Sequence, residues 1–199
     1  DTAKQIHDLS FEFLLYSMRV SQKTKADSLQ YLNEMKELYK QYPENEQVYG
    51  GLSDAYMLNN QNDEVIRLAD EHAANFPNSC LPHVYKGYLS MQQKKYDEAI
   101  AEFDKVGEDN KNLFLQCVYN RAVCKWNKAA EINESKSDPR TGRLSAADDK
   151  VFKDILHSAQ LDFEKAKELD PDQMTVKWGY LLKNIYTQTG QQEKADAIM

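Results

Sequence analysis

Apolar residues recur every three or four positions along most of the chain, a spacing that predicts amphipathic helices rather than strands. The most regular stretch runs from residue 80 to residue 113. It divides into two short helices joined by a polar turn, with Gly87 on the first helix and Tyr96, Ala99 and Phe103 on the second. Neither helix can bury its apolar face alone, so this hairpin predicts similar hairpins before and after it in the chain.

The flanking sequence has the same pattern. Proline ends two of the predicted hairpins, at Tyr42-Pro43 and Phe76-Pro77, because proline disfavours helix at the residue before it. A polar turn is predicted at Asn59–Asn62. A last hairpin is predicted to begin near Met174. The other predicted helices and hairpins occupy residues 3–22, 25–41, 46–79 and 80–113.

The hairpins repeat with a fixed period. Ser53 and Gly87 are 34 residues apart, as are Val65 and Ala99. This period and pattern resemble the tetratricopeptide (TPR) repeat, in which small residues let two helices approach and an aromatic residue fills the space between them. Ala99 and Phe103 stand in two of these slots. The slots recur at Ala159, Phe163, Ala166 and Pro171, whereas the third repeat lacks its closing proline, and Val65 and His72 replace small residues in the second.

The resemblance implies an all-α fold, a right-handed superhelix of about five TPR-like hairpins in one domain. The fourth hairpin is predicted to be longer than the others. Ala122 stands in its small-residue slot, but the alanine expected at position 134 appears at Ala159, which indicates an insertion of 25 residues near 130–154. Both flanks of the insertion have helical spacing, so we expect a prolonged helical arm. The predicted repeats are residues 12–45, 46–79, 80–113, 114–173 and 176–199.

Charge and composition exclude several classes of protein. The net charge is −7 with Lys and Arg dispersed among acidic residues, which argues against nucleic acid as the main partner. No apolar run has the length of a membrane span. Three cysteines are too few for a disulfide framework, so we expect free thiols, with a contact between Cys80 and Cys117 as the alternative.

Catalytic and metal-binding motifs are not apparent. The four histidines lie in different helical units, so no zinc site is expected, and His72 and His83 are predicted to be surface or edge residues. There is no glycine-rich phosphate loop, and the carboxylates alternate with lysines as on solvated helix faces. We therefore expect no enzymatic activity, no cofactor and no metal.

The TPR resemblance implies a concave groove lined by the first helix of each hairpin. The middle of this groove is rich in aromatic residues and methionine, types that make good binding anchors. The alternative is that several of them, such as Val84, Tyr119 and Val123, pack against the adjacent repeat. The candidate partner-binding residues are Tyr16, Met57, Tyr88, Met91, Tyr119, Val123, Trp126, Tyr180 and Asn184.

These residues predict a protein-protein interaction scaffold that binds a peptide or a helix in its groove. The basic and asparagine side chains with which some TPR proteins grip a chaperone's C-terminal carboxylate do not match at the corresponding positions, so that role is not expected. The alternative hypothesis is a homo-oligomerising, structural or accessory module of a bacterial envelope complex. A chain that opens at Asp1 fits an exported or periplasmic bacterial protein whose signal peptide has been removed, which is the location we expect, and a trimmed cytoplasmic protein is the alternative.

Overall fold

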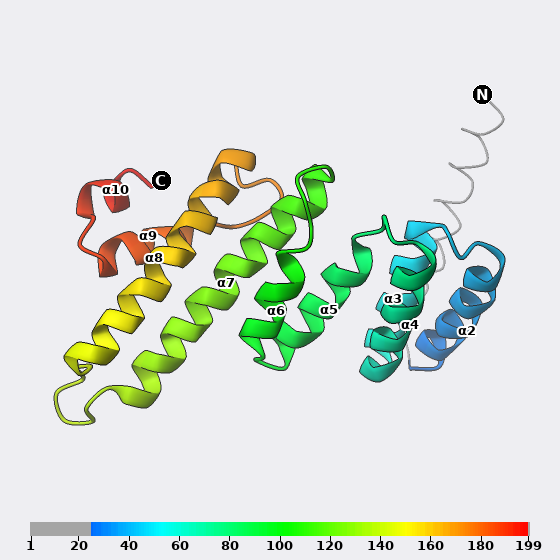
Figure 1. Ribbon diagram of the computed structural model, residues 1–199, viewed down its shortest axis with the longest axis horizontal. Helices are drawn as coiled ribbons and strands as arrows, with labels where there is room; N and C mark the ends of the chain where they lie inside the picture. The colour runs from blue at the N-terminus through cyan, green and yellow to red at the C-terminus, as the bar shows by residue number, and fades with distance from the viewer. Residues whose placement is uncertain (1–24, 199) are drawn as a thin grey trace. The chain divides into compact units, whose positions relative to one another are not determined.

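The computed structural model describes residues 25–198, and this part of the chain is built of helices without a strand (Figure 1). The predicted helix over residues 3–22, and with it the candidate Tyr16, lies outside the described residues. The predicted all-α fold of helical hairpins is confirmed. The helices are α2 (Lys25–Gln41), α3 (Glu46–Leu58), α4 (Asn62–Asn75), α5 (Leu81–Gln92), α6 (Tyr96–Phe103), α7 (Lys111–Lys136), α8 (Ala146–Leu169), α9 (Gly179–Gln188) and α10 (Gln192–Asp196).

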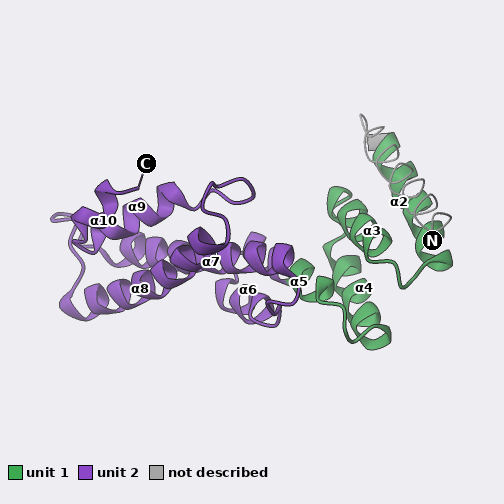
Figure 2. Ribbon diagram, turned by 90° about the horizontal axis from the view of Figure 1, so that it is seen from above, with its two compact units in different colours: residues 1–86 green, residues 87–199 purple. Residues whose placement is uncertain are grey.

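The chain divides into two compact units, residues 1–86 and residues 87–199 (Figure 2). Unit 1 contains α2, α3 and α4 and the first half of α5. Unit 2 contains the rest of α5 and all later helices.

In unit 1, side chains at the ends of α3 satisfy backbone groups that the helix leaves unpaired. The Asn45 side chain accepts hydrogen bonds from the backbone N–H groups of Gln47 and Val48, at 2.9 and 3.2 Å. The predicted turn follows α3, and Asn60 adopts a positive φ of 57°, which asparagine tolerates better than most residues. These local signals set the bounds of the helices, and the buried faces then form one core. That core consists of Tyr31, Leu32, Met35, Tyr39, Val48, Tyr49, Leu52, Ala55 and Leu68.

In unit 2 the lengthened hairpin is the main element. Helices α7 and α8 have 26 and 24 residues and run antiparallel (Figure 1). The side chains of Asn110 and Ser145 cap their N-termini. At the tip, the Asp138 carboxylate accepts hydrogen bonds from the backbone N–H groups of Arg140 and Thr141 at 2.9 and 2.8 Å. The prediction of a prolonged fourth hairpin is confirmed.

The helix of the last hairpin starts at Gly179, later than the apolar spacing predicts. Asp170 is the physical reason, because its carboxylate accepts hydrogen bonds from three successive backbone N–H groups, those of Met174, Thr175 and Val176, at 2.8 to 2.9 Å. The Trp178 indole N–H also donates to the Asp170 carbonyl at 2.7 Å. The segment between α8 and α9 is therefore an ordered loop in which Asp170 makes most of the hydrogen bonds, and the Gln173 side chain accepts one more from the Gly179 N–H at 2.8 Å.

The prediction that His72 lies at the surface is wrong. Its side chain on α4 is fully buried, and its Nδ1 lies 3.1 Å from the Tyr39 hydroxyl. A sequence signal for burial did exist, since His72 occupies a slot that the repeat pattern gives to a small packing residue. None of the three cysteines, all within the described residues, forms a disulfide; Cys117 and Cys124 are buried and Cys80 is partly buried.

Candidate interaction surface

The structure divides the candidate partner-binding residues between the two units. Met57, near the end of α3, is half-buried and belongs to unit 1. The other described candidates belong to unit 2, where they lie on α5, α7 and α9. These are Tyr88, Met91, Tyr119, Val123, Trp126, Tyr180 and Asn184.

Three candidates form one face of α7. Tyr119, Val123 and Trp126 are spaced by four and three residues, which places them on the same side of the helix. All three are half-buried and pack at the edge of the core of unit 2. The Tyr119 ring meets the buried Phe163 ring edge to face, with 5.9 Å between centroids, and burial raises the pKa of the Tyr119 hydroxyl. Each side chain thus has one side in the core and the other at the surface.

The end of α5 contributes to the same surface. The Tyr88 ring packs edge to face on Phe103 at 5.7 Å between centroids, and its hydroxyl donates a hydrogen bond to the Gln116 side-chain oxygen at 3.3 Å. Gln116 is one turn before Tyr119 on α7, so this bond brings the α5 and α7 candidates together. Met91 follows Tyr88 on α5 and is also half-buried. We call Tyr88, Met91, Tyr119, Val123 and Trp126 the aromatic face.

The α9 candidates are different. Tyr180 is 75 % exposed and Asn184 is half-buried, on a helix that packs against α8 and α10. Met174, in the loop before α9, is 82 % exposed. The structure does not tie Tyr180 to the core in the way that it ties Tyr119 or Tyr88, so this part of the candidate set stands apart from the aromatic face.

A charged cluster on other sides of α7 was missed by sequence reasoning. Asp162 of α8 is buried, and its carboxylate accepts two hydrogen bonds from the Arg121 guanidinium, at 2.9 and 2.6 Å, and one from Lys125 at 2.6 Å. Arg121 also pairs with Asp104, which follows α6. The spacing of Arg121 and Lys125 by four residues is the signal that could have indicated a shared acidic partner. This cluster links α7 to α8 and to the residue that follows α6.

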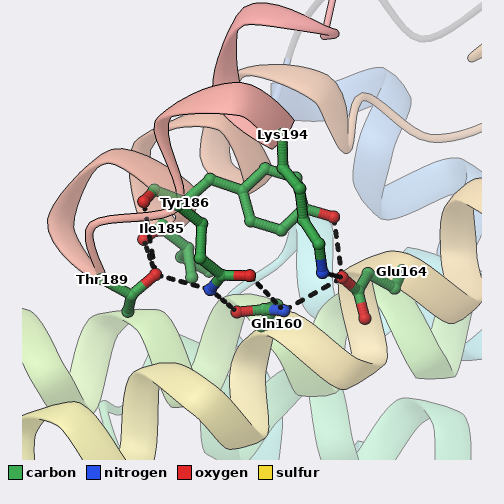
Figure 3. Close-up of polar contacts among 7 residues, drawn as sticks. Gln160, Glu164, Ile185, Tyr186, Thr189 and Lys194 are labelled. Atoms are coloured by element: carbon green, nitrogen blue, oxygen red, sulfur yellow. Dashed lines mark hydrogen bonds and ion pairs between the residues drawn. The ribbon is translucent and has the colours of Figure 1, made fainter.

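A second polar network fastens the terminal hairpin to α8 (Figure 3). The side-chain amides of Gln160 and Gln191 bond to each other, the closer contact being 2.7 Å. The Glu164 carboxylate accepts hydrogen bonds from Gln160 at 3.0 Å and from the Tyr186 hydroxyl at 2.7 Å, and Lys194 lies 3.4 Å away. Gln160 is buried, so its hydrogen bonds satisfy polar groups within the packed interface between α8 and the terminal hairpin.

Neither a metal site nor a membrane span emerges from the described part of the chain. Nowhere in residues 25–198 do three or more His, Cys, Asp or Glu side chains come together as metal ligands would. The helices described are also too short or too polar to cross a bilayer.

Comparison with known proteins adds evidence on the fold. No family model and no curated protein matches the sequence. A solved structure titled "MamA MSR-1 C2", a TPR-fold protein, is similar with a TM-score of 0.55 and 18 % sequence identity, over 91 % of this chain and 85 % of that one. The chain has a TPR-like helical-repeat fold. At this identity the likeness concerns the fold alone.

Proposed function

We propose that this protein is a non-catalytic scaffold that binds a protein partner through the aromatic face of unit 2. The observation that supports the proposal is the aromatic face itself, five large side chains without a charge in a chain whose residues are 29 % charged. Charged residues are typically depleted at the centre of a binding interface, where tyrosine, tryptophan and methionine are enriched.

The half-buried state of these side chains also favours binding. Tyr88, Tyr119 and Trp126 are held on one side by the core, so they lose little conformational entropy when a partner covers the other side. Met91 adapts its shape to the partner. The matching surface on the partner is an uncharged, apolar one, such as one face of an amphipathic helix. Such binding depends little on salt concentration, because no ion pair contributes to it.

The test uses Tyr88→Ala and Trp126→Ala in the full chain, each first shown by circular dichroism to keep its helical content. Partners are crosslinked in native extract and identified by mass spectrometry, and the affinity for the purified partner is then measured at two salt concentrations. Truncation of an aromatic anchor costs about 2 kcal/mol or more, so binding weakens by about thirtyfold. Leu161→Ala is the matched control, because Leu161 is an exposed apolar residue of α8 outside the aromatic face. Equal recovery of partners with all four proteins would refute the proposal.

Self-association is a second candidate function, favoured by the exposure of Met174 and Tyr180. Large apolar side chains as exposed as these two become favourable contacts when a second protein covers them. Light scattering on the purified protein tests this candidate directly. A dimer that becomes a monomer in Tyr180→Ser supports it, and a monomer at all concentrations contradicts it.

A further inference from the structure

The core of unit 1 contains an ionisable side chain in an aromatic cluster. The His72 imidazole is fully buried, and it packs against the rings of Tyr49 and Phe76 at 4.1 and 4.7 Å between centroids. Tyr39 completes the cluster through the contact of its hydroxyl with Nδ1. These rings come from α2, α3 and the end of α4, so His72 contacts both neighbouring helices, α2 and α3.

The hydrogen bonding of His72 suits only the neutral ring. Neutral imidazole has one donor and one acceptor nitrogen, and Nδ1 can play either role toward the Tyr39 hydroxyl. Among the described residues, Nε2 is buried without a hydrogen-bond partner. When the ring gains a proton, both nitrogens become donors. The Nε2–H group then has no acceptor, and a positive charge lies in an apolar core.

The ionisable groups around His72 do not offset this cost. On α2 the neighbour is Tyr39, where burial raises the hydroxyl pKa to about 12, so it remains neutral. The ionisable neighbours on α3 are Glu46 and Tyr49, and burial also raises the pKa of Tyr49. The ionisable neighbour on α4 is Glu71. The exposed Glu46 and Glu71 carboxylates favour the charged imidazole, but desolvation by burial is the larger effect and lowers the pKa of His72.

We propose that His72 is a proton-sensitive switch in unit 1, and that protonation in mildly acidic solution loosens the packing of α2, α3 and α4. An imidazole whose pKa is lower in the folded than in the unfolded state costs nothing above its ordinary pKa of 6.5. As the pH falls below that value, the unfolded chain takes up the proton first, and the folded unit loses stability. The loss becomes complete below the pKa of the folded state.

Tyr39 connects the cluster around His72 with the surface of unit 1. Tyr39 of α2 also lines an open cleft, together with Tyr56 of α3 and Leu68 and Glu71 of α4. Acidification would act on unit 1 and leave the aromatic face of unit 2 without a comparable buried imidazole, since His157, the histidine in that unit, is exposed.

The test compares the full chain with His72→Phe, in which an apolar ring replaces the imidazole, and with His157→Gln as the control. Amide hydrogen exchange is followed at pH 7.5 and pH 5.5, corrected for the intrinsic dependence on pH. We expect peptides from α2, α3 and α4 of the unmodified protein to exchange several-fold faster at pH 5.5. Those of His72→Phe should not accelerate, and those of His157→Gln should behave as in the unmodified protein. The same acceleration in His72→Phe would overturn the proposal.

A second measurement does not depend on a variant that folds. The imidazole resonances of the unmodified protein are titrated by NMR. The proposal requires that His72 titrate below its ordinary pKa while the protein is folded. A His72 ring that titrates at or above that value, as it would if the faces of Tyr49 and Phe76 stabilised the cation, contradicts it.

Discussion

A Cβ atom added to Gly87 would lie 2.5 Å from Cε1 of Phe103, closer than a side-chain carbon approaches another heavy atom. The two residues lie on α5 and α6, and Phe103 is fully buried. Gly87 and Phe103 therefore pack in a complementary way: the absence of a side chain on α5 makes room for the aromatic ring on α6. This is the contact that the small-residue and aromatic slots of the repeat predict.

Gly87→Ala should destabilise the protein. Alanine favours a helix over glycine by about 1 kcal/mol. We expect the clash with a buried ring to outweigh this gain and to leave a net loss of about 1–2 kcal/mol in the free energy of unfolding. Gly50→Ala on α3 is the control, since its Cβ would meet the Tyr85 hydroxyl at an ordinary 3.4 Å. Chemical denaturation of both variants gives the comparison. An alanine at position 87 that raises stability would show that the ring can move away.

Asp162→Asn should also destabilise the protein, because it leaves the Arg121 and Lys125 cations facing a neutral amide. Hydrogen bonds to charged groups contribute about 1.5–3 kcal/mol, and a loss of this size is expected in the free energy of unfolding. Asp97→Asn removes a carboxylate that pairs with Lys128 at the surface, where an ion pair contributes at most about 1 kcal/mol. An equal loss in the free energy of unfolding for the two substitutions would mean that the buried ion pairs of Asp162 stabilise the protein no more than the exposed pair of Asp97.

Asp170 should make stability depend on acid pH. Its hydrogen bonds from the backbone N–H groups, that of Val176 first, hold the pKa of the carboxyl below its ordinary value of 3.8. Stabilisation by the charged carboxylate is then fully present above pH 3.8 and is lost as the pH falls through the lowered value. The thermal midpoint is measured from pH 6 to pH 2 for the unmodified protein and for Asp170→Asn. The difference in thermal midpoint between the two proteins should become smaller as the pH falls. A difference that does not change with pH would contradict the stabilising role of the charged Asp170 carboxylate.

Only the outer part of the long hairpin, beyond the residues that pack on the core, should be dispensable for folding. Replacing residues 133–150 with a short turn keeps Phe152 and Ile155, which pack on the core of unit 2, and should leave cooperative unfolding intact. Deleting residues 130–154 removes Phe152, and the loss of its half-buried ring should cost roughly 1–3 kcal/mol. Differential scanning calorimetry distinguishes the two. If the shorter deletion already abolishes the transition, the exposed part of the arm supports the fold.

Much of the local structure could be predicted without coordinates. The turn at Asn59–Asn62, the lengthened hairpin and the slots of Ser53, Gly87 and Phe103 follow from helical spacing and from which residues end helices. The candidate surface could be predicted less well. Tyr88, Tyr119 and Tyr180 all occupy groove positions of the repeat. The structure places Tyr88 and Tyr119 against buried aromatic rings and leaves Tyr180 mostly exposed. The repeat position states which face a side chain occupies and not how much of it a neighbour covers.

The sequence by itself determined where the helices lie and that they pair as hairpins, because helix propensity, caps and apolar spacing act between residues close in the chain. Only the tertiary structure decided the outcome for polar residues. Asp162 forms ion pairs with two cationic side chains of α7, and Asp170 accepts hydrogen bonds from the loop before α9. His72 is buried among aromatic rings from α2, α3 and the end of α4. Each depends on groups from other helices or from a folded loop. The charge and solvation of such a side chain are settled only when those groups have packed around it.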